Sequence, residues 1–307
     1  MRSNPLRLIG VIVLAWAFTI PALQAQKFTD WSAPTNIGSV VNSVYNDQHP
    51  AISPDGLSLY FVSDRPGSAG GLDLWVSQRD SLDDPWQPPL AITPLNTTST
   101  ENAPAFSPDG HLLFFGSDRL GGCGNQDIWV SFRKDKRDDL GWQAPVNLGC
   151  VVNFSGFDDG PTYVSEEDGA VTLYFTSLNR SGGFGDWDVW AATMNADGTF
   201  NSPANVLELN SSARDTRTAI SRNGNELLLT SNRSGGIGGL DIWVSTRDES
   251  GVWSTPADLG GTVNSAANDG APALSRDGTT LFFYSNRPGG SGLNDLYVAT
   301  RSKKTGD

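Results

Sequence analysis

The sequence predicts an all-β protein, a five-bladed β-propeller of four-stranded blades. The first observation is a repeated segment that begins near residue 50 and returns near residues 104, 161, 218 and 272. The second is its spacing of 54, 57, 57 and 54 residues, which is typical of a blade made of short strands. The third is composition, because 34 Gly, 14 Phe and 10 Trp with 18% charged residues fit strands joined by tight turns.

Each repeat supplies four strands in the same order. In the first repeat a strand begins at Pro50, a Pro-Asp-Gly turn follows, and a mostly apolar second strand covers 57–63. A Gly-rich loop leads to a third strand over 73–79, and a fourth strand begins at Trp86. The Gly-rich loops join two strands and open no helix, so they are not phosphate-binding loops.

The last repeat lacks its fourth strand, and the N-terminal segment over 31–41 resembles a fourth strand without a blade. Residues 272–307 and 27–49 number 36 and 23, which together make about one repeat. We therefore expect the N-terminal strand to complete the last blade and so to remove a free sheet edge. Residues 26–307 then form a single propeller domain.

Residues 1–25 indicate a secretory signal peptide. Arg2 and Arg7 form a positively charged region before an apolar run over 8–20. Ala22 and Ala25 mark a cleavage zone after it. The run is short for a membrane span, so we expect cleavage after Ala25 and no membrane insertion afterwards. The expected location is the periplasm or the extracellular space.

Charge narrows the class of partner. The chain has 34 acidic and 21 basic residues, whereas nucleic acids and anionic membranes are bound by basic surfaces. We expect a monomer that binds an envelope or extracellular protein, or a glycan, and no nucleic acid.

The segments PAISPDG, SDRPGSAGG and DLWV, with their counterparts in the other repeats, resemble the WD-like repeats of TolB-type propellers. The resemblance covers about residues 27–302 and implies a periplasmic or secreted propeller that binds proteins or glycans. The main hypothesis is therefore a binding module with no catalytic residues. The alternative is a glycan-active enzyme, a glycoside hydrolase or a polysaccharide lyase, with its site at the mouth of the propeller channel.

Charged residues recur at fixed places in every repeat. A carboxylate precedes each first strand, and an Arg follows each second strand. These residues could form a polar binding ring around the channel mouth, or each carboxylate could pair with an Arg and brace its blade. Pairing is favoured, because a feature repeated in every blade is usually architectural. The carboxylates are Asp47, Glu101, Asp158, Asp215 and Asp269, and the arginines are Arg65, Arg119, Arg180, Arg233 and Arg287.

Function is more often found where the repeats differ. The two residues just before each first strand differ between repeats. His49 and Arg217 stand where other repeats have Ala or Gly, and Asp159 stands where other repeats have Gln, Asn, Thr or Gly. Asp158 beside Asp159 forms a carboxylate pair of the kind that raises a pKa for acid-base work on a glycosidic bond. Trp187 replaces Leu, Gln or Asn of the other repeats and could stack on a sugar. The simpler interpretation is that these are solvated loop residues.

The two cysteines, Cys123 and Cys150, fall in links on the same face of the propeller. A disulfide requires their Cα atoms to lie within about 7 Å, and the intervening strands could hold them further apart. His49 and His111 fall on opposite faces, so no zinc site is expected. We expect no cofactor, except that the rings of Asp and Asn offer oxygen ligands of the kind that calcium prefers.

Overall fold

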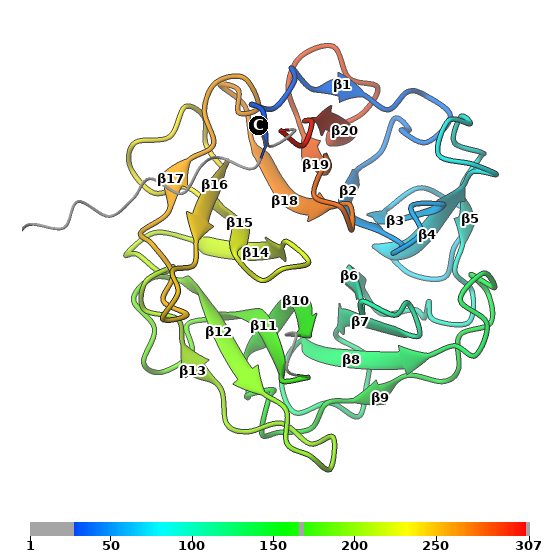
Figure 1. Cartoon of the computed structure of the whole chain (residues 1–307). Coiled ribbons are helices and arrows are strands. Elements are labelled where there is room, and N and C mark those ends of the chain that lie inside the picture. The colour runs from blue at the N-terminus through cyan, green and yellow to red at the C-terminus, as the bar shows by residue number, and fades with distance from the viewer. Residues whose placement is uncertain (1–27, 166–168, 305–307) are drawn as a thin grey trace, which may run out of the picture.

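A computed structural model of the chain describes residues 28–165 and 169–304. Five four-stranded antiparallel sheets are arranged around a central axis as the blades of a propeller (Figure 1). This confirms the predicted fold class. The predicted signal peptide lies outside the described residues. Among the residues that are described, no helix is long and apolar enough to cross a membrane.

Each blade runs from an inner first strand to a short outer fourth strand (Figure 1). The first two blades consist of β2 (Asp47–Ile52), β3 (Ser58–Ser63), β4 (Asp73–Gln78) and β5 (Leu90–Ala91), and of β6 (Glu101–Phe106), β7 (Leu112–Ser117), β8 (Asp127–Phe132) and β9 (Val146–Asn147). The next two consist of β10 (Phe157–Ser165), β11 (Val171–Leu178), β12 (Trp187–Thr193) and β13 (Ala204–Asn205), and of β14 (Asp215–Ile220), β15 (Glu226–Ser231), β16 (Asp241–Thr246) and β17 (Ala257–Asp258). The fifth consists of β18 (Asp269–Leu274), β19 (Thr280–Ser285), β20 (Asp295–Thr300) and the N-terminal β1 (Thr35–Asn36).

The ring closes as the sequence predicts. Strand β1 pairs antiparallel with β20, and Thr35 lies opposite Val298. The fifth blade therefore combines three C-terminal strands with the N-terminal strand β1. This pairing closes the propeller and joins the two ends of the chain (Figure 1).

Aromatic side chains from the third strands fill the spaces between blades. Trp75, Trp129, Trp190 and Trp243 are all buried. Trp75, for example, belongs to an apolar cluster that includes Phe61 of its own blade and Phe282 of the fifth blade. Full burial of a large apolar side chain contributes about 1.5–3 kcal/mol. The repeated aromatic residues therefore hold each blade against the next.

A polar network joins the first two blades. Asp139, in the loop after β8, is buried and accepts hydrogen bonds from the Tyr60 hydroxyl at 2.9 Å and from Arg133 Nη1 at 2.5 Å through Oδ1. Its Oδ2 accepts from Ser58 Oγ at 2.6 Å and from Gln78 Nε2 at 2.7 Å. These partners compensate a buried charge that would otherwise destabilise the fold.

Cys123 and Cys150 form a disulfide, with their Cα atoms 5.5 Å apart. It links the loop between β7 and β8 to the segment after β9 and so fixes the outer part of the second blade. The bond closes a loop of 27 residues.

Replacing both cysteines with Ser should lower the free energy of unfolding by about 3–4 kcal/mol, because the loop is no longer closed in the unfolded chain. Denaturant titrations of the wild type and the double variant measure the difference. The wild type under reducing conditions should match the variant. Equal midpoints for the oxidised wild type and the variant would contradict this account.

Candidate functional site

Every inner strand is interrupted by a β-bulge at the same place, where its register against the second strand shifts. The residue at the bulge has a positive φ of 49° to 61°, a conformation that non-Gly residues rarely adopt. Bulges change the direction of a side chain, and all five of these residues line the central channel. They are His49, Ala103, Gly160, Arg217 and Ala271.

Of these five bulge positions, only those of His49 and Arg217 carry a polar side chain. Both side chains belong to one ring of polar contacts. His49 Nδ1 lies 2.6 Å from Asn102 Oδ1, and Asn102 Nδ2 donates to Asp159 Oδ2 at 3.1 Å. Arg217 Nη2 donates to Asp159 Oδ2 at 2.9 Å and lies 3.1 Å from His49 Nδ1. We call His49, Asn102, Asp159 and Arg217 the channel-head quartet.

The shorter contact at Nδ1 assigns the tautomer of His49. The Asn102 amide nitrogen faces the Asp159 carboxylate, so the amide oxygen faces His49 at 2.6 Å and accepts an Nδ1 proton. The longer approach of Arg217 Nη2 to Nδ1, at 3.1 Å, is then a contact between two donors and not a hydrogen bond. Burial and then the Arg217 guanidinium hold the pKa of His49 well below its usual range. The imidazole is therefore neutral at pH 7, and Nε2 is its basic nitrogen. Nε2 has no hydrogen-bond partner among the described residues.

Asp159 lies behind His49 and Arg217. It is 6% exposed, and its Oδ1 is buried without a hydrogen-bond partner among the described residues. Gly116, opposite Asn102 on β7, leaves the space that Oδ1 occupies, because a Cβ atom at Gly116 would collide with that oxygen. Asp159 thus holds Arg217 in place through one oxygen and retains an unused acceptor.

The channel and the face around its mouth enclose about 2150 Å³. The lining consists of the inner strands from the bulges to the turns that follow them, and of residues further out in the blades, such as Trp86, Arg247 and Arg301. His49 and Arg217 lie at the inner end of the channel, and the turns around Pro54, Arg222 and Arg276 lie at its rim. The sequence analysis placed the candidate residues at the channel mouth, just before the first strands. In the structure, the residues that precede the bulges do not line the channel, whereas His49 and Arg217 do.

The expected carboxylate ring does not face the channel. Asp47, Glu101, Asp158, Asp215 and Asp269 are all fully buried. Glu101, Asp215 and Asp269 pair with an Arg of their own blade at 2.5 to 2.9 Å, and Asp47 pairs with Arg65. A binding role is therefore not supported for these four carboxylates, because pairing engages the oxygen atoms. No cluster of three or more metal-ligating side chains occurs in the described parts of the chain, and calcium binding stays a prediction.

Asp158 differs from its counterparts because its Arg is further away. Arg180 Nη1 lies 3.4 Å from Asp158 Oδ1, and burial raises the pKa of this carboxyl to about 6. Ser177 and the Phe154 backbone N–H also donate to it, which limits the rise of the pKa. Asp158 therefore does not act together with Asp159, its neighbour in sequence, because its oxygens bond within the blade.

The raised pKa of Asp158 has a consequence for stability. Its folded-state pKa exceeds the unfolded value near 4, so the protonated carboxyl stabilises the fold at low pH, and this contribution is lost as the pH rises through about 6. Relative to an Asp158→Asn variant, the wild type should therefore lose free energy of unfolding between about pH 4 and pH 7. Denaturant titrations across that range measure it, and a difference that stays constant or grows would contradict it.

Trp187 lies on β12 and does not line the channel. Its ring is partly buried, and the Arg214 guanidinium lies 5.8 Å from the ring centroid. The structure thus brings together three predicted residues, His49, Asp159 and Arg217, and leaves Trp187 apart. Asn102 completes the quartet but was not predicted as a site residue. The signal was its position, since it precedes its bulge as Asp159 does.

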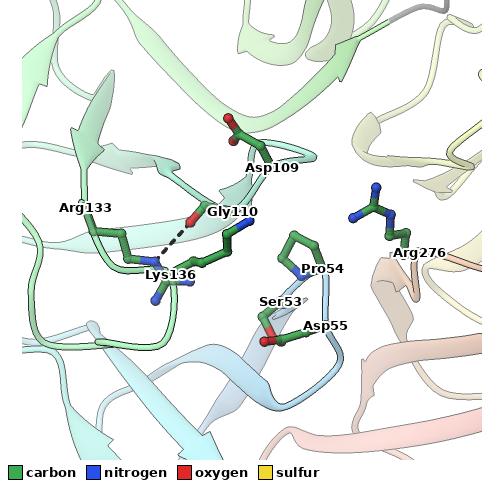
Figure 2. A pocket seen from close by; sticks show the side chains of 8 residues that line it. All are labelled: Ser53, Pro54, Asp55, Asp109, Gly110, Arg133, Lys136 and Arg276. Carbon is green, nitrogen blue, oxygen red and sulfur yellow. Dashed lines mark hydrogen bonds between the residues drawn. The ribbon is translucent and has the colours of Figure 1, made fainter.

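A small side pocket of about 120 Å³ opens at the rim of the channel. It shares Pro54, Asp55 and Arg276 with the channel and is also lined by Arg133 and Lys136. In Figure 2, Pro54 lies between Lys136 and Arg276. The rim pocket therefore gathers cationic side chains from the second and fifth blades.

No protein-family model and no curated protein sequence matches this chain. Solved structures do match its fold. An α-L-arabinofuranosidase from Lactobacillus brevis shares 14% identity with a TM-score of 0.59, over 87% of this chain and 92% of that one. A thermostable family-43 glycoside hydrolase shares 11% identity with a TM-score of 0.58, over 87% and 92%. An α-L-arabinofuranosidase from Podospora anserina in complex with cellotriose shares 15% identity with a TM-score of 0.58, over 90% and 98%.

These matches correct two sequence predictions. The resemblance to TolB-type repeats is wrong, because the matching structures are glycoside hydrolases with this propeller fold. The hypothesis of a binding module without catalysis is overturned by the same comparison, which favours the alternative. At these identities the likeness itself shows the fold alone.

Proposed function

We propose that this protein is a glycan-active enzyme whose site is the channel-head quartet. The observation that carries the proposal is the placing of His49 and Arg217 at the inner end of the channel. A neutral His with a free Nε2 is a general base at pH 7, and a guanidinium beside it can stabilise negative charge as that charge develops. The propeller neighbours that act on arabinose-containing glycans support a glycan as the substrate.

Each member of the quartet has a role in this proposal. His49 accepts or returns a proton at Nε2, and Arg217 binds and orients the substrate. Asn102 and Asp159 are positioning residues, since Asn102 accepts the Nδ1 proton of His49 and Asp159 anchors the guanidinium.

We also propose a periplasmic or extracellular location. A disulfide between Cys123 and Cys150 persists in an oxidising compartment, and the apolar N-terminal run over 8–20 supports export.

The test is cleavage of polysaccharides. The purified protein is incubated with arabinan, arabinoxylan and polygalacturonate, and new reducing ends are measured. At least one polysaccharide should be cleaved by the wild type and by a His111→Ala control, and not by His49→Ala. Cleavage of none of them, or equal cleavage by both His variants, would overturn the proposal.

A further inference from the structure

Arg217 is only partly occupied by the quartet. Its Nη2 donates to Asp159, whereas Nε and Nη1 have no hydrogen-bond partner among the described residues. Because the side chain lines the channel, Nη1 offers an N–H donor to a ligand beside the Nη2 that bonds Asp159. A carboxylate is the group that such a guanidinium donor binds most strongly, through a charge-assisted hydrogen bond.

The rim pocket provides a second, independent indication. Arg133 is fully buried, and its Nη2 is a buried donor without a partner among the described residues. Arg133 lines the rim pocket together with Lys136 and Arg276, both exposed. Asp55 and Asp109 also line it, but each accepts hydrogen bonds within its own turn, from Ser53 and Ser107. The unpaired Arg133 donor, together with the exposed Lys136 and Arg276, suits a second anionic group on the same ligand.

The residues that line the channel carry a net positive charge, as those of the rim pocket do. Outside residues 166–168, which the structure does not describe, eight Arg and Lys residues line the channel against three acidic residues. This contrasts with the whole chain, which has 34 acidic and 21 basic residues. Most of these cations lie away from the inner end, so they attract anions to the mouth of the channel.

Among the residues that the structure describes, the channel head holds no pair of free carboxylates of the kind that glycoside hydrolysis normally uses. Asp159 is engaged by Arg217, and the other described carboxylates of the channel lie near its rim. Among these, Glu226 pairs with Arg301 at 2.6 Å, and Asp277 accepts from Ser275 at 2.6 Å. A base and a cation without a carboxylate pair favour another way of breaking a glycosidic bond.

We propose, resting on the proposed function, that the substrate is a glycan of 4-linked uronic acids and that it is cleaved by β-elimination. Arg217 Nη1 donates to the carboxylate on C5. His49 Nε2 removes the C5 proton, and the electron pair of that C–H bond forms the C4=C5 double bond as the C4–O bond breaks. The imidazolium then returns the proton to the departing oxygen. Charge that develops on the carboxylate is stabilised by Arg217, and the rim pocket binds a uronate further along the chain.

The test uses two readouts on the same reactions. Polygalacturonate, alginate, arabinan and arabinoxylan are incubated with the purified protein. New reducing ends report any cleavage, and ultraviolet absorbance reports the conjugated double bond that elimination alone creates. Both signals should rise together on a uronate polymer and stay absent on the two neutral arabinose-containing polymers.

Paired variants test the rim pocket. Lys136→Ala combined with Arg276→Ala should raise KM for the uronate polymer about tenfold with kcat unchanged, since charge-assisted contacts to the bound chain are lost. Arg137→Ala, an exposed neighbour of Lys136 outside the pocket, is the matched control and should leave KM unchanged.

The outcomes separate this inference from the proposed function. Cleavage of a neutral polymer without new absorbance would overturn the inference and leave the proposed function standing. Reducing ends from a uronate polymer without absorbance would overturn the elimination step. An unchanged KM in the double variant would overturn the role of the rim pocket, and no cleavage of any polymer would overturn both the inference and the proposed function.

Discussion

His49→Ala should lower kcat by about two to four orders of magnitude, because the reaction loses its general base. The fold should survive the change. Ala103 and Ala271 occupy the equivalent bulges in other blades with φ values of 53° and 49°, close to the 52° of His49. A loss of activity in this variant therefore reports chemistry and not unfolding.

The pH profile adds a second readout for His49. Its pKa is held well below the usual range by burial and by Arg217, so the neutral base should persist into mildly acidic solution. The groups that face it are Arg217 of β14, Asp159 of β10 and Tyr284 of β19, whose ring lies 5.7 Å from the imidazole. Wild-type activity should stay level from neutral to mildly acidic pH, and a fall centred on the ordinary His pKa of about 6.5 would contradict this environment.

His111→Ala is the matched control, since the chain has two His residues. His111 bonds to the Arg133 carbonyl oxygen at 2.9 Å and does not line the channel. The His111→Ala variant should therefore retain full activity. Equal rates for the two variants would remove His49 from the mechanism.

Asp139→Asn should lower the free energy of unfolding by about 3–5 kcal/mol, the largest stability effect expected for one substitution here. The change removes the negative charge that compensates Arg133, whose side chain is 1% exposed. In the wild type, Ser58 and Gln78 donate hydrogen bonds to the Asp139 carboxylate. In the variant, the amide N–H group of the new Asn side chain would face one of these donors and could not accept its hydrogen bond. Denaturant titration measures the shift in midpoint.

Two further variants sharpen that experiment. Asp138→Asn changes the exposed neighbouring residue and should shift stability by less than about 0.5 kcal/mol. Replacing both members of the buried pair, with Arg133→Met and Asp139→Leu, should cost less than Asp139→Asn alone, because no charge is left uncompensated. An Asp139→Asn variant as stable as the wild type would show that the network does not hold the first two blades together.

The repeat made most of the fold predictable. Blade number, strand order and the joining of β1 to β20 follow from spacing and from the missing fourth strand, since a propeller must bury its edges. The pairing of Arg with carboxylates could also be predicted, because it recurs in every repeat.

The site was less predictable because its geometry depends on the bulges. Sequence differences identified His49, Asp159 and Arg217, but the register shift decides which of two adjacent side chains faces the channel. Asp158 and Asp159 illustrate this, because one bonds within its blade and the other belongs to the quartet. The sequence does not mark the bulge, so the face of the channel could not be placed, and the position that Asn102 shares with Asp159 did not by itself identify Asn102 as a site residue.

The most direct test of the channel-head site is a crystal structure of the His49→Ala variant with an oligosaccharide of the polymer that the wild type cleaves. We predict a sugar ring at the inner end of the channel, with a polar group within hydrogen-bond distance of Arg217 Nε or Nη1. An oligosaccharide bound on the opposite face, near Trp187 and away from Arg217, would contradict the account.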